Sequence, residues 1–176
     1  AASDVYKRQD VYGLAKLMGG KKPFVNKLQM VFDEGLYDPA NEPDIAYAHL
    51  FSYFKGEEWR TQKETQRLLD KYFTTKPDGI PGNDDTGTMS AWAIFNMIGF
   101  YPDCPGLPEY TLTTPVFNKV TIRLDPKWYK ENELVIESNR TGSETLYINK
   151  VLLDGKKFNK YRITHDELVH LSLIHI

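Results

Sequence analysis

The hydrophobic period of the chain changes once, near residue 115, and no other feature constrains the fold as strongly. Before this point apolar side chains recur at helical spacing, as in 44–54, where they follow an i, i+3, i+4, i+7 pattern. Beyond it, apolar residues alternate with polar ones, as at Val120, Ile122 and Leu124. Helices followed by strands, rather than helices alternating with strands, predict the α+β class with an antiparallel sheet region.

Five segments before the change are predicted to be helices, with turn residues between them. Pro23 occupies a tolerated first-turn position in the second segment. Lys63, Glu64 and Arg67 are expected on the outer face of the fourth segment, and the fifth is apolar nearly all round, which indicates central burial. The predicted helices are residues 10–18, 23–33, 44–54, 57–73 and 88–98, and the predicted strands lie around 120–124, 134–136 and 146–148.

Composition narrows the classes of function. The formal net charge is −2, so nothing in the charge balance implies a nucleic-acid partner. We find no run of 18 apolar residues and therefore predict no membrane span. The one cysteine, Cys104, lies in a loop and permits no disulfide within the chain.

Both ends of the chain are expected to be foreign to the protein. Residues 4–9 can be encoded as GAT GTG TAT AAG AGA CAG, and the reverse complement of that DNA translates as residues 171–176. One DNA segment read on opposite strands therefore yields both ends, as a sequencing-library adapter would. We expect residues 1–9 and 171–176 to be adapter-derived and the natural protein to be a longer chain.

An acidic loop with the sequence DPANEP, residues 38–43, precedes the third predicted helix. A carboxylate there can be explained by the macrodipole of the helix that follows. Alternatively, Asn41 and Glu42 offer an amide carbonyl and a carboxylate together, and such oxygen ligands suit Ca²⁺. Local pattern leaves both interpretations open. His49, within the following helix, is expected to be a packing or surface residue.

A second acidic stretch, PGNDDTGTMSAW, opens the fifth predicted helix. One of its two adjacent carboxylates, Asp84 or Asp85, can cap that helix. Thr86 or Thr88 could cap it equally well, so the pair exceeds what capping needs. Adjacent acids repel each other, and a placed carboxylate beside a water is what a general base requires. Capping and catalysis both remain open from the spacing alone.

Five segments together resemble glycoside hydrolase family 92, a family of calcium-dependent exo-acting α-mannosidases. The resemblance runs in order from about Asp10 to His170, and the NEP and GNDD elements are specific in combination. The segments are GLAKLMGG (13–20), NEPDIAYAHLFSYF (41–54), WRTQK (59–63), PDGIPGNDDTGTMSAWAIFNMIGFYPDCPG (77–106) and PVFNKVTIRL (115–124).

The resemblance implies the architecture. The family has an N-terminal β-sandwich, then an (α/α)6 toroid, with β-structure near the C-terminal end. Residues 10–106 are therefore expected to be the last helices of the toroid, part of the catalytic domain, and residues 107–170 a closing antiparallel β-segment. The β-sandwich would belong to the same natural chain, upstream of these residues.

The resemblance also implies an inverting mechanism, in which one carboxylic acid protonates the leaving oxygen and a carboxylate activates water. We assign the base to Asp85, with Asp84 as an auxiliary catalytic residue. We predict substrate contacts at Asn83 and Trp92, and a Ca²⁺ ion held by Glu42 and Asn41. The ion in this family contacts mannose hydroxyls and helps to distort the ring. The list of expected site residues is Asn41, Glu42, Asn83, Asp84, Asp85 and Trp92.

One element of the family is missing. The general acid is a Glu in an aromatic-rich motif ahead of the GLAKLMGG segment, and nothing in residues 1–40 matches that motif. We therefore expect the acid to lie upstream and this chain alone to be inactive.

The expected partners are mannose-containing glycans, and the expected location is periplasmic, cell-surface or secreted. The alternative is a non-catalytic module of a toroid glycosidase that binds carbohydrate or holds a structural calcium ion, with its acidic loops acting as caps. The sequence carries no indication of linkage preference.

Overall fold

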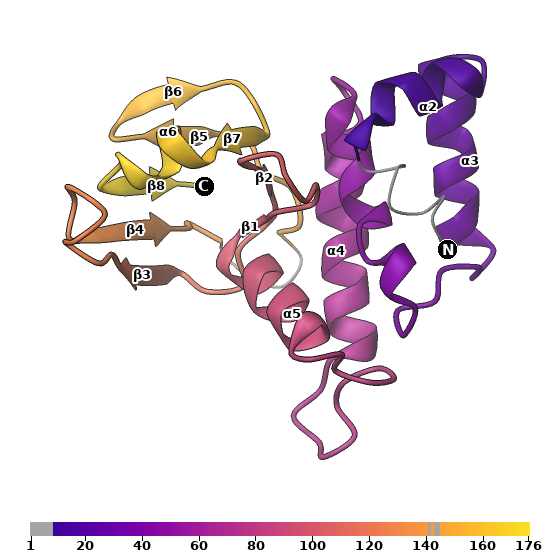
Figure 1. Cartoon of the computed structure of the whole chain (residues 1–176), viewed down its shortest axis with the longest axis horizontal. Helices are drawn as coiled ribbons and strands as arrows, with labels where there is room; N and C mark the ends of the chain where they lie inside the picture. Colours follow the sequence, from indigo (N-terminus) through magenta and orange to yellow (C-terminus); the bar gives the residue numbers. More distant parts are fainter. Residues whose placement is uncertain (1–8, 141, 143–144) are drawn as a thin grey trace.

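The computed structural model describes residues 9–140, 142 and 145–176, with Glu42 described by its backbone alone. Helices α2, α3 and α4 gather on one side of the molecule and the strands, with α6 among them, on the other; α5 lies between the two groups (Figure 1). The helices are α2 (Val11–Leu17), α3 (Lys21–Asp33), α4 (Glu58–Tyr72), α5 (Thr88–Ile98) and α6 (His165–Val169), with 3-10 turns η1 (Glu42–Asp44) and η2 (Tyr47–Tyr53). The strands are β1 (Phe100–Tyr101), β2 (Glu109–Leu112), β3 (Lys119–Arg123), β4 (Glu133–Glu137), β5 (Val151–Leu153), β6 (Lys156–Phe158), β7 (Arg162–Thr164) and β8 (Leu173–His175).

The predicted combination of helices with antiparallel sheets is confirmed. The α-helix predicted over 44–54 is wrong, because this segment winds as a 3-10 helix instead. In an α-helix the carbonyl of Ile45 would accept the backbone N–H of His49. Here that carbonyl accepts the indole Nε1–H of Trp92 at 2.9 Å, and the N–H of His49 donates to the Ala46 carbonyl at 3.0 Å. A tertiary hydrogen bond therefore accompanies the tighter 3-10 winding of η2.

The expected exposure of Glu64 is also wrong. Its side chain is fully buried between α3 and α4. Gln29 of α3 donates to one carboxylate oxygen at 3.1 Å, and the Arg67 Nε lies 2.9 Å from the other. Burial of this charge is possible because both oxygens face positive or donor groups.

The strands form two sheets, β1-β2-β7 and β3-β4-β8-β5-β6. All strand pairs are antiparallel except β4 with β8, which is parallel. The strand predicted around 146–148 does not form. Instead, the backbone N–H of Ile148 donates to the Gln62 side chain on α4 at 3.0 Å.

Residues predicted to be adapter-derived form the central strand of the larger sheet. Ile174 of β8 pairs with Ile136 of β4 and Leu153 of β5, and its side chain is buried. The foreign origin of residues 171–176 stays a prediction, because any short alternating apolar segment can pair in this way. Residues 1–8 lie outside the described part of the chain.

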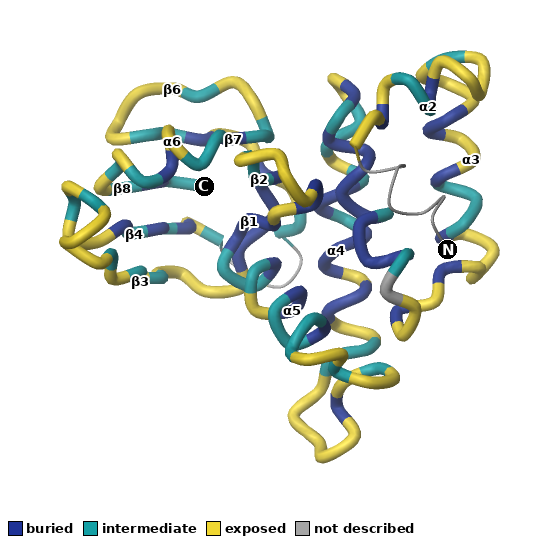
Figure 2. The backbone as a smooth tube through the Cα atoms, in the orientation of Figure 1, coloured by how far each residue is buried: buried dark blue, intermediate teal, exposed yellow. Residues whose placement is uncertain are grey.

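Two apolar cores meet at β1. Phe100 packs in the core of the strands, while its neighbour Tyr101 packs in the core of the helices. Alternation along even a two-residue strand sends successive side chains to opposite faces. Buried residues accordingly concentrate where α4, α5 and β1 meet (Figure 2). Among the described helices, none is both long and apolar enough to cross a membrane.

A buried ion pair joins the two parts of the molecule. The Arg162 guanidinium of β7 donates to both carboxylate oxygens of Asp103, at 3.0 and 3.1 Å. The same carboxylate accepts the hydroxyl of Tyr53 from η2 and that of Thr111 from β2, each at 2.8 Å. The guanidinium carbon lies 4.0 Å from the centre of the Tyr53 ring. We call Tyr53, Asp103, Thr111 and Arg162 the Asp103 cluster.

We expect Asp103→Ala to destabilise the chain strongly. The change leaves Arg162, whose side chain is only 15% exposed, without its main counter-ion, and breaking a buried pair in this way costs about 3–5 kcal/mol. Glu109→Ala is the control, because Glu109 also contacts Arg162 but is 38% exposed, and it should cost less than about 1 kcal/mol. Urea unfolding followed by circular dichroism measures both, and equal losses would contradict the assignment.

Candidate active site

The structure brings the two acidic loops into contact. We call residues 38–44 the NEP loop and residues 81–87 the acidic loop. A Cβ atom placed on Gly82 would lie 2.5 Å from the Cβ of Ala40 and 3.2 Å from its Cα. Gly82 also has a φ of +65°, so glycine is required there both for space and for backbone conformation. Segments about 40 residues apart in the sequence therefore form one surface.

The acidic loop turns sharply just before α5. Asp85, Thr86 and Gly87 have successive φ angles of 46°, 61° and 94°, all in the left-handed region. Such conformations cost about 1–3 kcal/mol each in non-glycine residues and gather at functional sites. The connection between α4 and α5 that carries this turn is mostly exposed (Figure 2).

Asp84 caps α5. Its Oδ1 accepts the backbone N–H of Ser90 at 2.8 Å. Its backbone carbonyl accepts the N–H groups of Gly87 and Met89 at 3.0 and 3.2 Å. These bonds satisfy N–H groups of the first turn that have no partner inside the helix. One of the two carboxylates is therefore occupied in holding the helix.

Asp85 differs from its neighbour. The residue is exposed, and in the described part of the chain its carboxylate has no hydrogen bond or ion pair. Its backbone carbonyl accepts the hydroxyl of Thr88 at 2.8 Å, which fixes the turn. The left-handed turn thus directs one carboxylate to the helix and leaves the other open to water.

The NEP loop is closed by its own side chains. Asp44 is buried and accepts the backbone N–H of Asp38 at 3.2 Å, while Asp38 accepts the N–H of Ala40 at 2.9 Å. Asn41 is exposed, and its backbone carbonyl accepts the Asp44 N–H at 2.9 Å. The side chain of Glu42 lies outside the described structure.

The side-chain groups of the NEP loop that could bind a metal ion do so through oxygen atoms, which are the ligands that calcium prefers. Within the described residues, no three His, Cys, Asp or Glu side chains gather closely enough to hold a metal ion. Asn41 and Glu42 would therefore supply only some of the six to eight ligands that calcium takes.

Two buried hydrogen bonds tie α5 to the segment after the NEP loop. Trp92 donates through Nε1 to the carbonyl of Ile45, and His49 Nε2 lies 2.9 Å from Oδ1 of Asn96. His49 lies four residues after Ile45, and Asn96 lies four residues after Trp92, so the two bonds run side by side along the same two segments. We call this pair of bonds the two-bond link. Together with the contact at Gly82, it places the NEP loop against the acidic loop.

The protonation of His49 follows from its partner. The Nδ2 of Asn96 donates to the Trp92 carbonyl at 2.8 Å, so its Oδ1 is the atom left to accept a hydrogen bond from His49. Burial lowers the pKa of His49, although Asp103 opposes that shift. The imidazole is therefore neutral at pH 7, with its proton on Nε2.

The six predicted site residues do not all face solvent. Asn83 and Asp85 are exposed in the acidic loop, and Asn41 is exposed in the NEP loop. Trp92 is 1% exposed, and its ring stacks on Phe73. In this structure its ring has no free surface for the predicted contact with a sugar.

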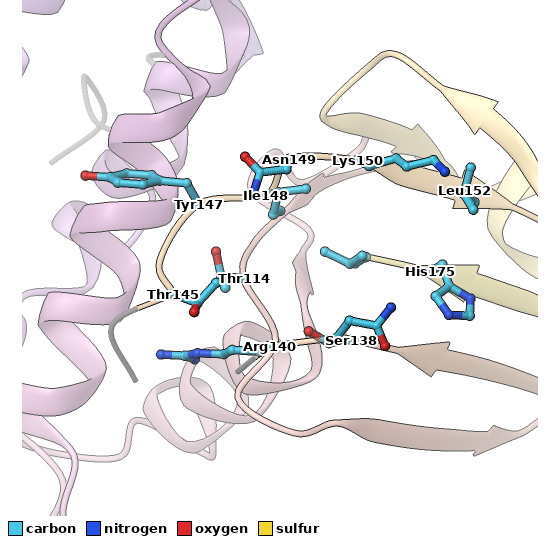
Figure 3. A pocket seen from close by; sticks show the side chains of 12 residues that line it. Thr114, Ser138, Arg140, Thr145, Tyr147, Ile148, Asn149, Lys150, Leu152 and His175 are labelled. Carbon is cyan, nitrogen blue, oxygen red and sulfur yellow. The ribbon is translucent and has the colours of Figure 1, made fainter. Parts of the chain in front are cut away.

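A separate pocket of about 250 Å³ lies between the segment 145–150 and one end of the five-stranded sheet (Figure 3). No residue of either acidic loop lines it. Its walls include Arg140, Tyr147, Asn149 and Lys150. Arg140 donates to the Gln66 side chain and to the Pro115 carbonyl. Because no residue of the NEP loop or the acidic loop lines this pocket, the pocket has no part in the candidate active site.

The chain matches the family model described as the glycosyl hydrolase family 92 catalytic domain, over residues 2–176. An uncharacterized secreted glycosidase of Arthroderma benhamiae is 29% identical over 157 residues, which cover 89% of this chain and 20% of that protein. A family GH92 α-mannosidase of Bacteroides thetaiotaomicron has a TM-score of 0.79 and 31% identity, covering 89% of this chain and 21% of its own. A family GH92 inverting mannosidase of the same organism has a TM-score of 0.78 and 30% identity, covering 93% of this chain and 25% of its own. The chain therefore spans about a fifth to a quarter of the length of these relatives.

Removing the Asp84 side chain should destabilise α5 chiefly through the loss of its hydrogen bond to the Ser90 N–H. We expect Asp84→Ala to lower the free energy of unfolding by about 1 kcal/mol. Asp84→Asn is the matched control, because asparagine caps as well as aspartate does and should cost only a few tenths. Urea unfolding of this chain separates them, and equal destabilisation by both variants would mean that the carboxylate charge matters rather than the cap.

Proposed function

The chain belongs to glycosyl hydrolase family 92, and on this premise we propose that it is part of an exo-acting α-mannosidase. The proposed enzyme cleaves terminal α-mannosidic bonds with inversion and depends on calcium. Support comes from the family match and from the similarity to two mannosidases of Bacteroides thetaiotaomicron, one of them described as inverting. Residues 10–106 would be the last helices of a toroid whose other helices lie outside this chain.

The observation that carries the proposal is the different use of the two carboxylates. Asp84 is occupied by the N–H of Ser90, whereas Asp85 is exposed and unpaired among the described groups. A general base must be ionised and must reach a water molecule. The exposure of Asp85 supports access to water, and Asp84 holds the turn that presents it.

In the proposed reaction, the Asp85 carboxylate accepts a proton from water as the water oxygen bonds to the anomeric carbon. The bond from that carbon to the leaving oxygen breaks, and a carboxylic acid donates its proton to that oxygen. The two carboxyl groups in inverting enzymes stand roughly 6.5–9.5 Å apart, which leaves room for the water. We propose that the acid is a Glu upstream of this chain, so these residues alone would be inactive.

Calcium, when bound, would orient and polarise sugar hydroxyl groups. We propose Asn41 and Glu42 as ligands, because both belong to the loop that contacts the acidic loop. Asp38 and Asp44 are occupied within the loop and are better suited to shaping it. The rest of the ligand set would come from water, substrate and parts of the protein beyond this chain.

Among the other predicted residues, Asn83 is the better candidate for touching sugar. It is exposed next to the two aspartates, and an amide offers both a donor and an acceptor to hydroxyl groups. Trp92 is proposed to act through Ile45. The Bacteroides α-mannosidase has been solved in complex with mannoimidazole, which supports mannose-containing glycans as the ligand class. The secreted fungal relative supports an exported protein.

We predict that Asp85→Asn in the full-length enzyme lowers kcat on an α-mannoside by about 10²–10⁴-fold, the usual contribution of a general base. Asparagine keeps the tolerance for a left-handed backbone, so the turn survives. Asp78→Asn is the control, since it removes one charge from an exposed position between α4 and α5. Wild-type rates for Asp85→Asn would favour the alternative, a non-catalytic module with acidic caps.

Chelation tests the calcium proposal. We expect EGTA to abolish turnover by the full-length enzyme and to lower its melting temperature, because an ion that binds only the folded state stabilises it. Added calcium should restore both, whereas magnesium, which demands a smaller octahedral site, should not. Unchanged activity and melting temperature after exhaustive chelation would rule out a calcium role for the NEP loop.

A further inference from the structure

We infer that His49 is a positioning residue of the proposed active site. Its hydrogen bond to Asn96 holds the NEP loop in a fixed position against the acidic loop. The inference rests on the proposed function, since it concerns the relative placement of the proposed calcium ligands and the proposed base. His49 itself lies in the core and touches neither loop's carboxylates.

The two-bond link lies directly behind the two loops. Ile45 directly follows the NEP loop, and Trp92 lies in the first half of α5, which directly follows the acidic loop. One hydrogen bond between these elements would fix their separation but allow one to pivot on the other. The bond between His49 and Asn96, four residues further along both elements, removes that pivot. The two bonds together therefore fix both distance and orientation.

The surroundings of His49 show that this bond is its specific contribution. Its ring stacks on Tyr101, with centroids 4.5 Å apart, and meets the Trp92 ring edge-on at 6.0 Å. An aromatic hydrocarbon ring could make both contacts. Only an N–H donor at the position of Nε2 can satisfy the buried Oδ1 of Asn96.

A histidine at this position also costs free energy, which a purely apolar ring would avoid. Its Nδ1 is buried and has no hydrogen-bond partner in the described structure. Buried polar atoms without partners are rare in native proteins and require a reason. The bond to Asn96 gives that reason, because it completes the link behind the two loops.

Asn96 extends the link to the strands. Its backbone carbonyl accepts the hydroxyl of Thr113, at 3.1 Å, from the segment that follows β2. His49, Asn96 and Thr113 thus form one buried row from the helical part to the β part. A shift of α5 relative to η2 would have to break this row.

Variants of the full-length enzyme test the role of His49. His49→Phe keeps the ring contacts but removes the donor, and His49→Gln restores an N–H close to the position of Nε2. Tyr53→Phe is the matched control. It also removes one partly buried hydrogen bond of η2, but that bond goes to Asp103, between β1 and β2.

We expect His49→Phe and Tyr53→Phe to lower the melting temperature by similar amounts. Only His49→Phe should lower kcat, by about 10- to 100-fold, because a misplacement near 1 Å has that effect. It should also weaken calcium binding measured by titration calorimetry, and His49→Gln should recover most of both losses. If His49→Phe behaves like Tyr53→Phe, or if His49→Gln recovers nothing, the inference is wrong.

Two further variants keep the outcome clear. If His49→Phe does not fold, Trp92→Phe removes the other bond of the link, and a kcat and calcium affinity equal to those of Tyr53→Phe would overturn the inference. Asp85→Asn, measured in the same series, reports on the proposed function alone. Wild-type turnover by Asp85→Asn would overturn that function, whereas an inactive Asp85→Asn beside an unaffected His49→Phe overturns only the role of His49.

Discussion

The buried carboxylate of Asp103 joins the helical part of this chain to its strands, and the packing of the two parts against each other depends on that connection. Asp103 receives donors from η2, β2 and β7. The donor from η2 is Tyr53, four residues beyond His49. The same short 3-10 segment is therefore fixed at one end to the β part and at the other to α5. Tyr53 is the last residue of η2 and lies at the end remote from the NEP loop, so the bond from His49 to α5 is the one that positions the loop.

Polar groups, rather than apolar packing, set the orientation of the elements behind the site. Apolar contacts tolerate small shifts, whereas a hydrogen bond weakens steeply when its angle changes. The Asp103 cluster and the two-bond link each lie between segments distant in sequence, where orientation has to be defined. Glu64 does the same between α3 and α4. Such networks add less to stability than to the uniqueness of the packing, which is what a site built from two loops requires.

The sequence predicted the elements much better than the contacts between them. Periodicity found α2, α3, α4 and α5 to within about two residues at each end, since each buries a face that recurs at helical spacing. It could not find the contact of Gly82 with Ala40 or the bond of Trp92 with Ile45, because no local pattern encodes partners about 45 residues apart. The 3-10 winding of η2 and the burial of Glu64 were missed for the same reason. Both depend on a long-range partner. The candidate residues of the acidic loop were visible because two carboxylates exceed what a cap needs.

The geometry of the acidic loop explains why two adjacent aspartates can have separate roles. Two carboxylates that share one environment repel each other. Here the chain enters the left-handed region at Asp85, so the side chain of Asp84 turns toward the N–H groups of α5 while that of Asp85 turns to solvent. The charge of Asp84 is favoured by the positive end of the helix and is fixed there. The strain of the two left-handed non-glycine residues, Asp85 and Thr86, is offset in part by the hydrogen bonds of Asp84 to the first turn of α5. A turn of this kind separates the structural acid from the one proposed to be catalytic.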